Sequence, residues 1–86
     1  MSGLQGKRWY FFIWDEDNEF HLARHHIFPE EAEQLFFNKY VITPNKKKHG
    51  PNRYLIEGRT DGNRKLRIVF EDLGNFTARI ITGWDI

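Results

Sequence analysis

Three short segments in the second half of the chain alternate between apolar and polar residues, and two turn sequences separate them. The segments span residues 53–60, 65–71 and 77–82, and the turns fall at 61–63 and 72–75. Alternation with a period of two is typical of a β-strand that buries one face. Because turns this short join only antiparallel neighbours, the pattern predicts a three-stranded antiparallel meander with one apolar and one polar face.

The first half of the chain has a different pattern. The aromatic run at 9–14 is short, continuous and β-prone, so it predicts a strand that is covered on both faces. Residues 40–43 predict another short strand, and a basic loop at 44–51 follows it. Residues 1–8 show no such pattern, and we expect them to form a flexible tail.

Two helices are expected between these strands. Phe20, Ala23 and Ile27 recur at i, i+3 and i+7, and they predict a helix over roughly 16–26 that begins with acidic residues. Pro29 fits the first position of a second helix. The apolar stripe of this second helix consists of Phe28, Ala32, Leu35 and Phe36.

The order of one strand, two helices and four strands predicts a single two-layer α+β domain over residues 9–86. A chain of 86 residues is too short to build two independent cores. It contains no cysteine, which excludes a disulfide framework and thiolate chemistry and fits a reducing cytoplasm. The longest apolar run has six residues, so we expect a cytoplasmic protein with no membrane partner.

Charge is divided unevenly along the chain. Residues 1–44 carry four Lys and Arg against seven Asp and Glu, whereas residues 45–67 carry eight against two. Residues 68–86 are acidic again, with one Arg against three acidic residues. A basic segment in an otherwise acidic chain produces a local positive field, which attracts an anionic partner.

The first turn of the meander sets the register of its polar face. A three-residue loop at 61–63 pairs Glu57 with Arg67 and Arg59 with Lys65. A two-residue turn would place apolar residues opposite charged ones. The amphipathic pattern therefore predicts a row of charged side chains on the polar face.

The second turn extends this row. A three-residue loop at 72–74 pairs Arg67 with Arg79, beside Glu57 and with Arg53 nearby. Two opposed guanidinium groups are unfavourable unless an anion lies between them. We interpret the row as a phosphate-binding face, because guanidinium groups match phosphate oxygens in bidentate geometry. The alternative is a solvated sheet face with weak ion pairs.

RNA cleavage is the reaction implied by the family resemblance that is described at the end of this section. Without a metal it requires a base for the 2′-hydroxyl, cations for the phosphorane and an acid for the 5′-oxygen. Glu57 or a histidine is the candidate base, and His25 and His49 are the candidate acid–base histidines. The cations expected to hold the phosphate are Arg53, Arg67 and Arg79, and the residues expected to bind the RNA are Lys46, Lys47, Lys48, His49, Arg59 and Lys65. Trp84 is expected either to pack in the core or an interface, or to stack on a base.

The histidines of the first helix have plainer interpretations. His21 and His25 are four residues apart, which is a spacing of metal ligands on a helix. No third ligand is evident beside them, so we expect no metal site and no cofactor. Capping of helix carbonyl groups is the expected role of His26, and it is an equal alternative to catalysis for His25.

Motifs in both halves of the chain resemble those of the BrnT-type toxins. The N-terminal motifs are Trp14-Asp15, Arg24-His25-x-Ile27, Glu30-Glu31-Ala32 and Phe36. The C-terminal motifs are Arg53-Tyr54, Gly58, Gly62, Leu66, Val69-Phe70 and Arg79-Ile80-Ile81-Thr82. The resemblance covers residues 12–85, and the positions that it marks for function are His25, Arg53 and Arg79.

The resemblance implies a RelE/ParE-like fold and a bacterial endoribonuclease that is the toxin of a type II toxin–antitoxin pair. It also implies a cognate antitoxin that inhibits the toxin, with operator DNA contacted only indirectly through that antitoxin. The family usually has an acidic residue before the matched Arg-Tyr and a basic C-terminal segment, where this sequence has Asn52 and Gly83-Trp84-Asp85-Ile86. The alternative is a catalytically inactive BrnT-like module that binds a protein partner or RNA.

Overall fold

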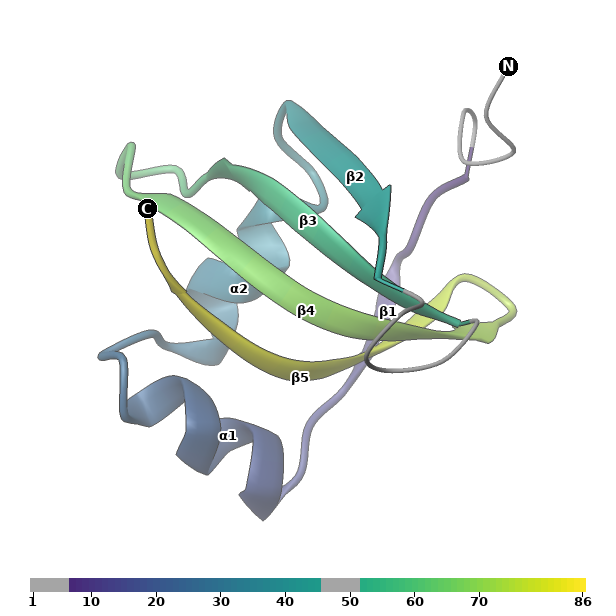
Figure 1. The fold of residues 1–86 in the computed structure, drawn as a ribbon, viewed down its shortest axis with the longest axis horizontal. Helices are drawn as coiled ribbons and strands as arrows, with labels where there is room; N and C mark the ends of the chain where they lie inside the picture. Colours follow the sequence, from purple (N-terminus) through teal and green to yellow (C-terminus); the bar gives the residue numbers. More distant parts are fainter. Residues whose placement is uncertain (1–6, 46–51) are drawn as a thin grey trace.

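The computed structural model describes residues 7–45 and 52–86, which form two helices and five strands (Figure 1). In chain order these are β1 (Phe11–Ile13), α1 (Glu16–Ala23), α2 (Pro29–Leu35), β2 (Tyr40–Pro44), β3 (Arg53–Arg59), β4 (Lys65–Gly74) and β5 (Thr77–Asp85). The predicted order of elements and the α+β class are confirmed. Most of the expected tail and of the expected basic loop lies outside the described residues.

The five strands form one mixed sheet in the order β1-β5-β4-β3-β2. Neighbours from β2 to β5 are antiparallel, so the predicted meander is confirmed, whereas β1 pairs with β5 in parallel. Both helices lie on one face of the sheet (Figure 1), with α1 along β5 and α2 against β3 and β4. No helix of the described chain covers the opposite face, which we call the open face.

The N-terminal aromatic run forms only a short edge strand. Phe11 and Ile13 are 62% and 42% exposed, so the predicted covering of both faces is wrong. The reason is that β1 pairs with β5 alone and the helices cover only one face of the sheet. Trp9, just before the strand, is buried, and its ring packs edge-on against Phe70 with 4.9 Å between the ring centroids.

Helix α1 is shorter than the sequence predicts. It ends at Ala23 rather than near residue 26, because His26 adopts a left-handed φ of 57°. The Ile27 amide then donates a hydrogen bond back to the carbonyl oxygen of Leu22 at 3.0 Å. This reversal satisfies a terminal carbonyl of the helix and directs the chain toward α2.

The face of α1 that meets the sheet carries Asn18 and Leu22, both buried. Asn18 Nδ2 donates hydrogen bonds to the carbonyl oxygens of Ile13 and Ile80, both at 2.9 Å. These bonds join α1 to β1 and β5. Phe20, which the sequence places on the apolar side of the helix, is 63% exposed.

Helix α2 begins at Pro29, as predicted. Ala32, Leu35 and Phe36 of its predicted stripe are buried against the sheet, whereas Phe28 is 69% exposed. The core therefore lies between this helix and the inner face of the sheet. Neither α2 nor any other helix in the described part of the chain is long and apolar enough to cross a membrane.

The β4–β5 hairpin reverses later than the sequence predicts. Asn75 and Phe76, with φ of 51° and 59°, form a two-residue turn, and Gly74 pairs with Thr77. The predicted three-residue loop is therefore wrong. The strands also contain two register shifts, one of which leaves Ile81 of β5 without a directly opposed residue.

Candidate functional site

Three directly opposed residues form a row across the three middle strands of the sheet, on its open face. We call this row the central row, and it consists of Glu57 on β3, Arg67 on β4 and Trp84 on β5. The predicted pairing of Glu57 with Arg67 is confirmed. Arg67 Nε donates a hydrogen bond to Glu57 Oε2 at 2.8 Å, and Arg67 Nη2 contacts the same oxygen. Both side chains keep 36% of their surface exposed, so a ligand can reach this charge-assisted contact.

Trp84, rather than Arg79, lies opposite Arg67. The predicted pairing of two guanidinium groups is wrong, because the extra residue at Ile81 shifts the alternation of β5 by one position. No like charges are forced together at this point in the structure. The central row instead places a carboxylate, a guanidinium and an indole side by side.

The neighbouring glycine confirms the direction of Trp84. A Cβ atom at Gly83 would overlap the Ile68 side chain and lie 3.3 Å from Leu22 Cδ2 on α1. Gly83 therefore faces the helices. Because successive residues of a strand point to opposite faces, the indole of Trp84 projects to the open face.

A second charged row crosses the open face: Arg53, Glu71 and Arg79. The row of Leu55, Val69 and Thr82 separates it from the central row. Arg79 Nη2 donates a hydrogen bond to Asp15 Oδ2 at 2.8 Å, which joins β5 to the start of α1. The Asn18 amide, and then Arg79, hold the pKa of Asp15 below its ordinary value. Arg53 Nε lies 4.0 Å from Glu71 Oε2 and has no hydrogen-bond partner among the described residues. Arg79 is thus a structural contact, whereas Arg53 has a donor to spare.

An open groove of about 770 Å³ lies beside the central row, and we call it the strand groove. The α2–β2 connection, the paired ends of β2 and β3, and the turn after β3 line it. Glu57 forms part of its wall together with Lys39, Arg59 and Lys65. The structure therefore brings two predicted RNA-binding residues, Arg59 and Lys65, into one groove with the predicted base.

Five predicted site residues are missing from this arrangement, for two different reasons. Lys46, Lys47, Lys48 and His49 lie outside the described residues. His25 lies in the connection from α1 to α2, and no contact within the described ranges joins it to Glu57 or Arg67. Those ranges also contain no group of three or more His, Asp or Glu side chains placed to hold a metal ion.

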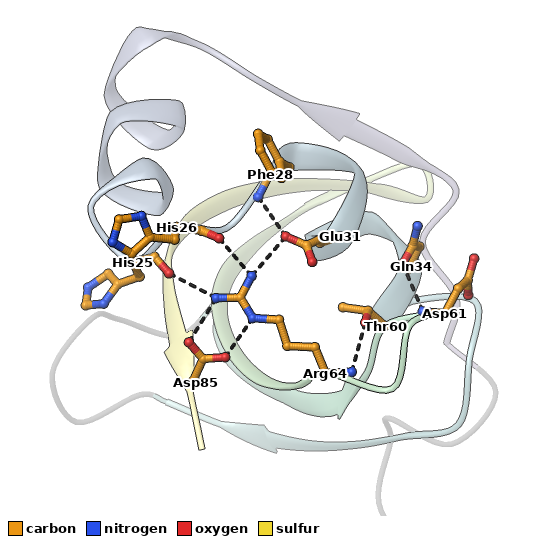
Figure 2. Close-up of polar contacts among 9 residues, drawn as sticks. All are labelled: His25, His26, Phe28, Glu31, Gln34, Thr60, Asp61, Arg64 and Asp85. Carbon is orange, nitrogen blue, oxygen red and sulfur yellow. Dashed lines mark hydrogen bonds and ion pairs between the residues drawn. The ribbon is translucent and has the colours of Figure 1, made fainter.

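Arg64 is a charged residue whose role the sequence did not reveal. Figure 2 shows its guanidinium at the centre of a ring of acceptors, with Nε and Nη2 donating to Asp85 at 2.7 and 2.9 Å. Nη1 donates to Glu31 Oε1 at 3.0 Å and to the carbonyl oxygen of His26 at 2.8 Å, and Nη2 donates to that of His25 at 3.0 Å. The hydrogen bonds to Asp85 raise the pKa of Arg64, and the same bonds lower the pKa of Asp85.

Arg64 therefore connects the α1–α2 turn, the first turn of α2 and the end of β5. All of these contacts are internal, so this cation is not available to an RNA ligand. The acceptors come from positions far from residue 64 in the sequence, and no local spacing marks them.

Comparison with known proteins identifies no relative, because no family model and no curated protein matches the chain. The function has to be argued from the open face. Its distinguishing feature is the central row with the strand groove beside it. The lining of that groove carries three cations, Lys39, Arg59 and Lys65, against the carboxylates of Glu57 and Asp61.

Proposed function

We propose that the open face binds RNA and that the protein is a metal-independent endoribonuclease, the toxin of a bacterial type II toxin–antitoxin pair. The observation that carries this proposal is the juxtaposition of a carboxylate, a guanidinium and an indole in the central row, from Glu57, Arg67 and Trp84. The resemblance of several sequence motifs to those of BrnT-type toxins supports the toxin role. A RelE/ParE-like topology, a cytoplasmic location and inhibition by a cognate antitoxin are parts of the same proposal.

The central row and the strand groove suit different parts of an RNA strand. The Arg67 guanidinium can hold two oxygens of one phosphate, and the Trp84 indole offers a ring for a base to stack on. Arg59 and Lys65 are exposed in the strand groove, where they can pair with neighbouring phosphates. A single strand running along the groove would therefore present one phosphate to the carboxylate of Glu57.

The reaction is an internal transfer to the 2′-oxygen. When Arg67 turns toward the phosphate, the Glu57 carboxylate accepts the proton of the 2′-hydroxyl, and the 2′-oxygen forms a bond to phosphorus. The bond from phosphorus to the 5′-oxygen breaks, and Arg67 stabilises the charge on the phosphorane. The 5′-oxygen takes a proton from the ammonium of Lys65, which gives up a proton far more readily than a guanidinium does. The products are a 2′,3′-cyclic phosphate and a 5′-hydroxyl, and solvent restores both side chains.

The proposal is tested by incubating purified protein with single-stranded RNA in EDTA and identifying the product ends. We expect 2′,3′-cyclic phosphate and 5′-hydroxyl ends from the natural protein. Glu57→Gln preserves the size of the side chain and removes the base, so the cleavage rate should fall about 100-fold or more. Glu71→Gln is the matched control, because it changes a carboxylate of the same face in the second row.

The control should cleave at close to the natural rate. Full activity of Glu57→Gln would contradict the assignment of the base. No cleavage by the natural protein, combined with no growth arrest on expression, would contradict the enzyme as a whole.

A second candidate function is a non-catalytic RNA-binding or protein-binding module. Two contacts favour it, because Glu57 is already engaged by Arg67 and Arg79 is engaged by Asp15. A module of this kind would bind a 2′-O-methyl RNA, which cannot be cleaved, and would leave ordinary RNA intact. Its affinity should fall steeply with salt, since phosphate contacts release counterions. Salt-independent binding would argue against RNA as the ligand.

A further inference from the structure

The helical layer has a groove of its own, on a different part of the surface from the strand groove. It has a volume of about 600 Å³ and runs along α1 to the start of α2. We call it the helical groove, and its lining residues are Glu16, Glu19, Phe20, Ala23, His26, Ile27, Phe28 and Pro29. None of these residues lines the strand groove.

The exposed apolar part of the helical groove comes from Phe20 and Ala23, whereas α1 meets the sheet through a different face that carries Leu22. Ile27, which follows the end of α1, also lines the groove but is itself buried in the core. Phe20 is exposed, and so is Phe28 across the groove. Helix α1 therefore carries a small exposed apolar patch, Phe20 with Ala23, in addition to the face that it buries against the sheet.

The rim of the helical groove is acidic. Glu16 and Glu19 line it directly. The segment from residue 15 to residue 35, which contains both helices, carries seven Asp and Glu and a single Arg. Two of these carboxylates, Asp15 and Glu31, are paired with Arg79 and Arg64, and the other five make no ion pair among the described residues. A surface of this charge repels RNA and attracts a basic partner.

We propose that the helical groove is the docking site for a basic amphipathic helix of a partner protein. Apolar side chains on one face of that helix would insert between Phe20 and Phe28, and Lys or Arg residues beside them would pair with Glu16 and Glu19. The proposal does not depend on RNA cleavage, because the helical groove shares no residue with the central row. Within the proposed toxin function, this partner would be the antitoxin.

A second copy of this chain is a poorer occupant. A two-fold contact through the helical groove sets the same surface against itself. Glu16 and Glu19 of the two copies would then approach each other with like charge. Charge complementarity therefore selects a basic partner over self-association.

The first experiment uses two synthetic helical peptides with leucines at i, i+3, i+4 and i+7. In the first peptide all of the remaining positions are lysine, and in the second peptide they are glutamate. The dissociation constant of each for the whole protein is measured by fluorescence anisotropy over a range of salt. We expect the lysine peptide to bind and the glutamate peptide not to bind, and equal binding of both, or of neither, would overturn the proposal.

Variants then locate the site. Phe20→Ala should weaken binding of the lysine peptide about tenfold, because an exposed aromatic anchor is removed. Phe11→Ala is its control, since Phe11 is just as exposed but lies on β1. Circular dichroism spectra verify that both variants stay folded. Equal weakening by the two substitutions would overturn the location.

A pair of charge variants tests the rim. Glu16→Gln with Glu19→Gln should weaken binding and flatten its dependence on salt. Asp17→Asn with Glu30→Gln makes the same change of charge outside the lining, at one position on α1 and one on α2, and it should have a smaller effect. The reverse order of effects would overturn the role of the acidic rim.

Two further measurements separate this proposal from its alternatives. Sedimentation that shows a dimer for the natural protein and a monomer for Phe20→Ala would overturn it in favour of self-association. Glu57→Gln should bind the lysine peptide normally, and Phe20→Ala should retain the RNA activity of the natural protein. The two proposals can therefore fail independently.

Discussion

A glycine at position 83 allows β5 to lie directly under α1. Its missing side chain leaves room for Ile68 and Leu22, which come from β4 and α1. The inward direction of Gly83 matches the outward direction of Trp84, because adjacent residues of a strand face opposite sides. The extra residue at Ile81 sets this alternation, and Gly83 makes it compatible with the close packing of α1.

The first residue-scale prediction is that Gly83→Ala destabilises the fold. The new methyl group would overlap the Ile68 side chain inside the core, so the free energy of unfolding should fall by about 1–3 kcal/mol. Urea denaturation measures the change. Gly62→Ala is the control, because its nearest neighbour would be Thr60 Oγ1 at 3.8 Å. Equal stability of the natural protein and Gly83→Ala would show that β5 and α1 are packed less closely than described.

At the scale of elements, the features that the sequence predicted correctly are those that depend on interactions between residues close together in the chain. The period of the strands and the proline at the start of α2 identify those elements, and the short loop at 61–63 sets the pairing of Glu57 with Arg67. The extra residue at Ile81 was not predictable, since a β-branched residue fits either face of a strand.

Long-range pairing explains what else the sequence did not reveal. The place of β1 at the sheet edge depends on a pairing with β5, at the far end of the chain. Arg64 binds groups near residues 25–31 and at residue 85. Neither composition nor residue spacing predicts these long-range contacts, because the residues meet only in the folded protein.

The second prediction concerns the connection between α1 and α2. Arg64→Lys keeps the charge but loses the bidentate contact with Asp85 and the bonds to the two histidine carbonyl groups, so the free energy of unfolding should fall by about 1–2 kcal/mol. Hydrogen exchange of the amides at residues 24–27 should also become faster. Arg59→Lys is the control, because Arg59 is exposed and, among the described residues, makes one side-chain hydrogen bond, to the carbonyl oxygen of Asn63. A similar effect of both substitutions would argue against the connecting role of Arg64.

At the scale of the whole molecule, several carboxylates stabilise the fold in their charged form. At Asp72, burial acts to raise the pKa, but hydrogen bonds from Lys7, the Gly74 amide and Trp9 outweigh it and leave the pKa below its ordinary value. The pKa of Asp85 is also lowered, as is that of Asp15. These groups join the two ends of the chain to the sheet and the helices to β5.

The third prediction follows from the sign of these shifts. The carboxyl groups of Asp15, Asp72 and Asp85 bind their protons less tightly in the folded protein than in the unfolded chain. Their stabilisation of the fold is therefore complete above an ordinary aspartate pKa of about 4. It is lost as the pH falls through the lower pKa values of the folded state. Urea midpoints measured between neutral and acidic pH should therefore decline at the acidic end. Asp85→Asn should lower the midpoint at neutral pH and weaken this decline, whereas Asp17→Asn, a change at an exposed carboxylate of α1, should leave the decline unchanged.

The parallel pairing of β1 with β5 has a consequence for the order of folding. Phe11 pairs with Thr77 and Ile13 with Arg79, so the first strand of the chain completes the sheet only after the last strand exists. The hairpins of β2 to β5 close short loops and can form earlier. On a ribosome, the aromatic residues near the N-terminus are made first and must wait for nearly all of the remaining chain. Until then they are exposed to other nascent chains, and this interval is where aggregation during synthesis would begin.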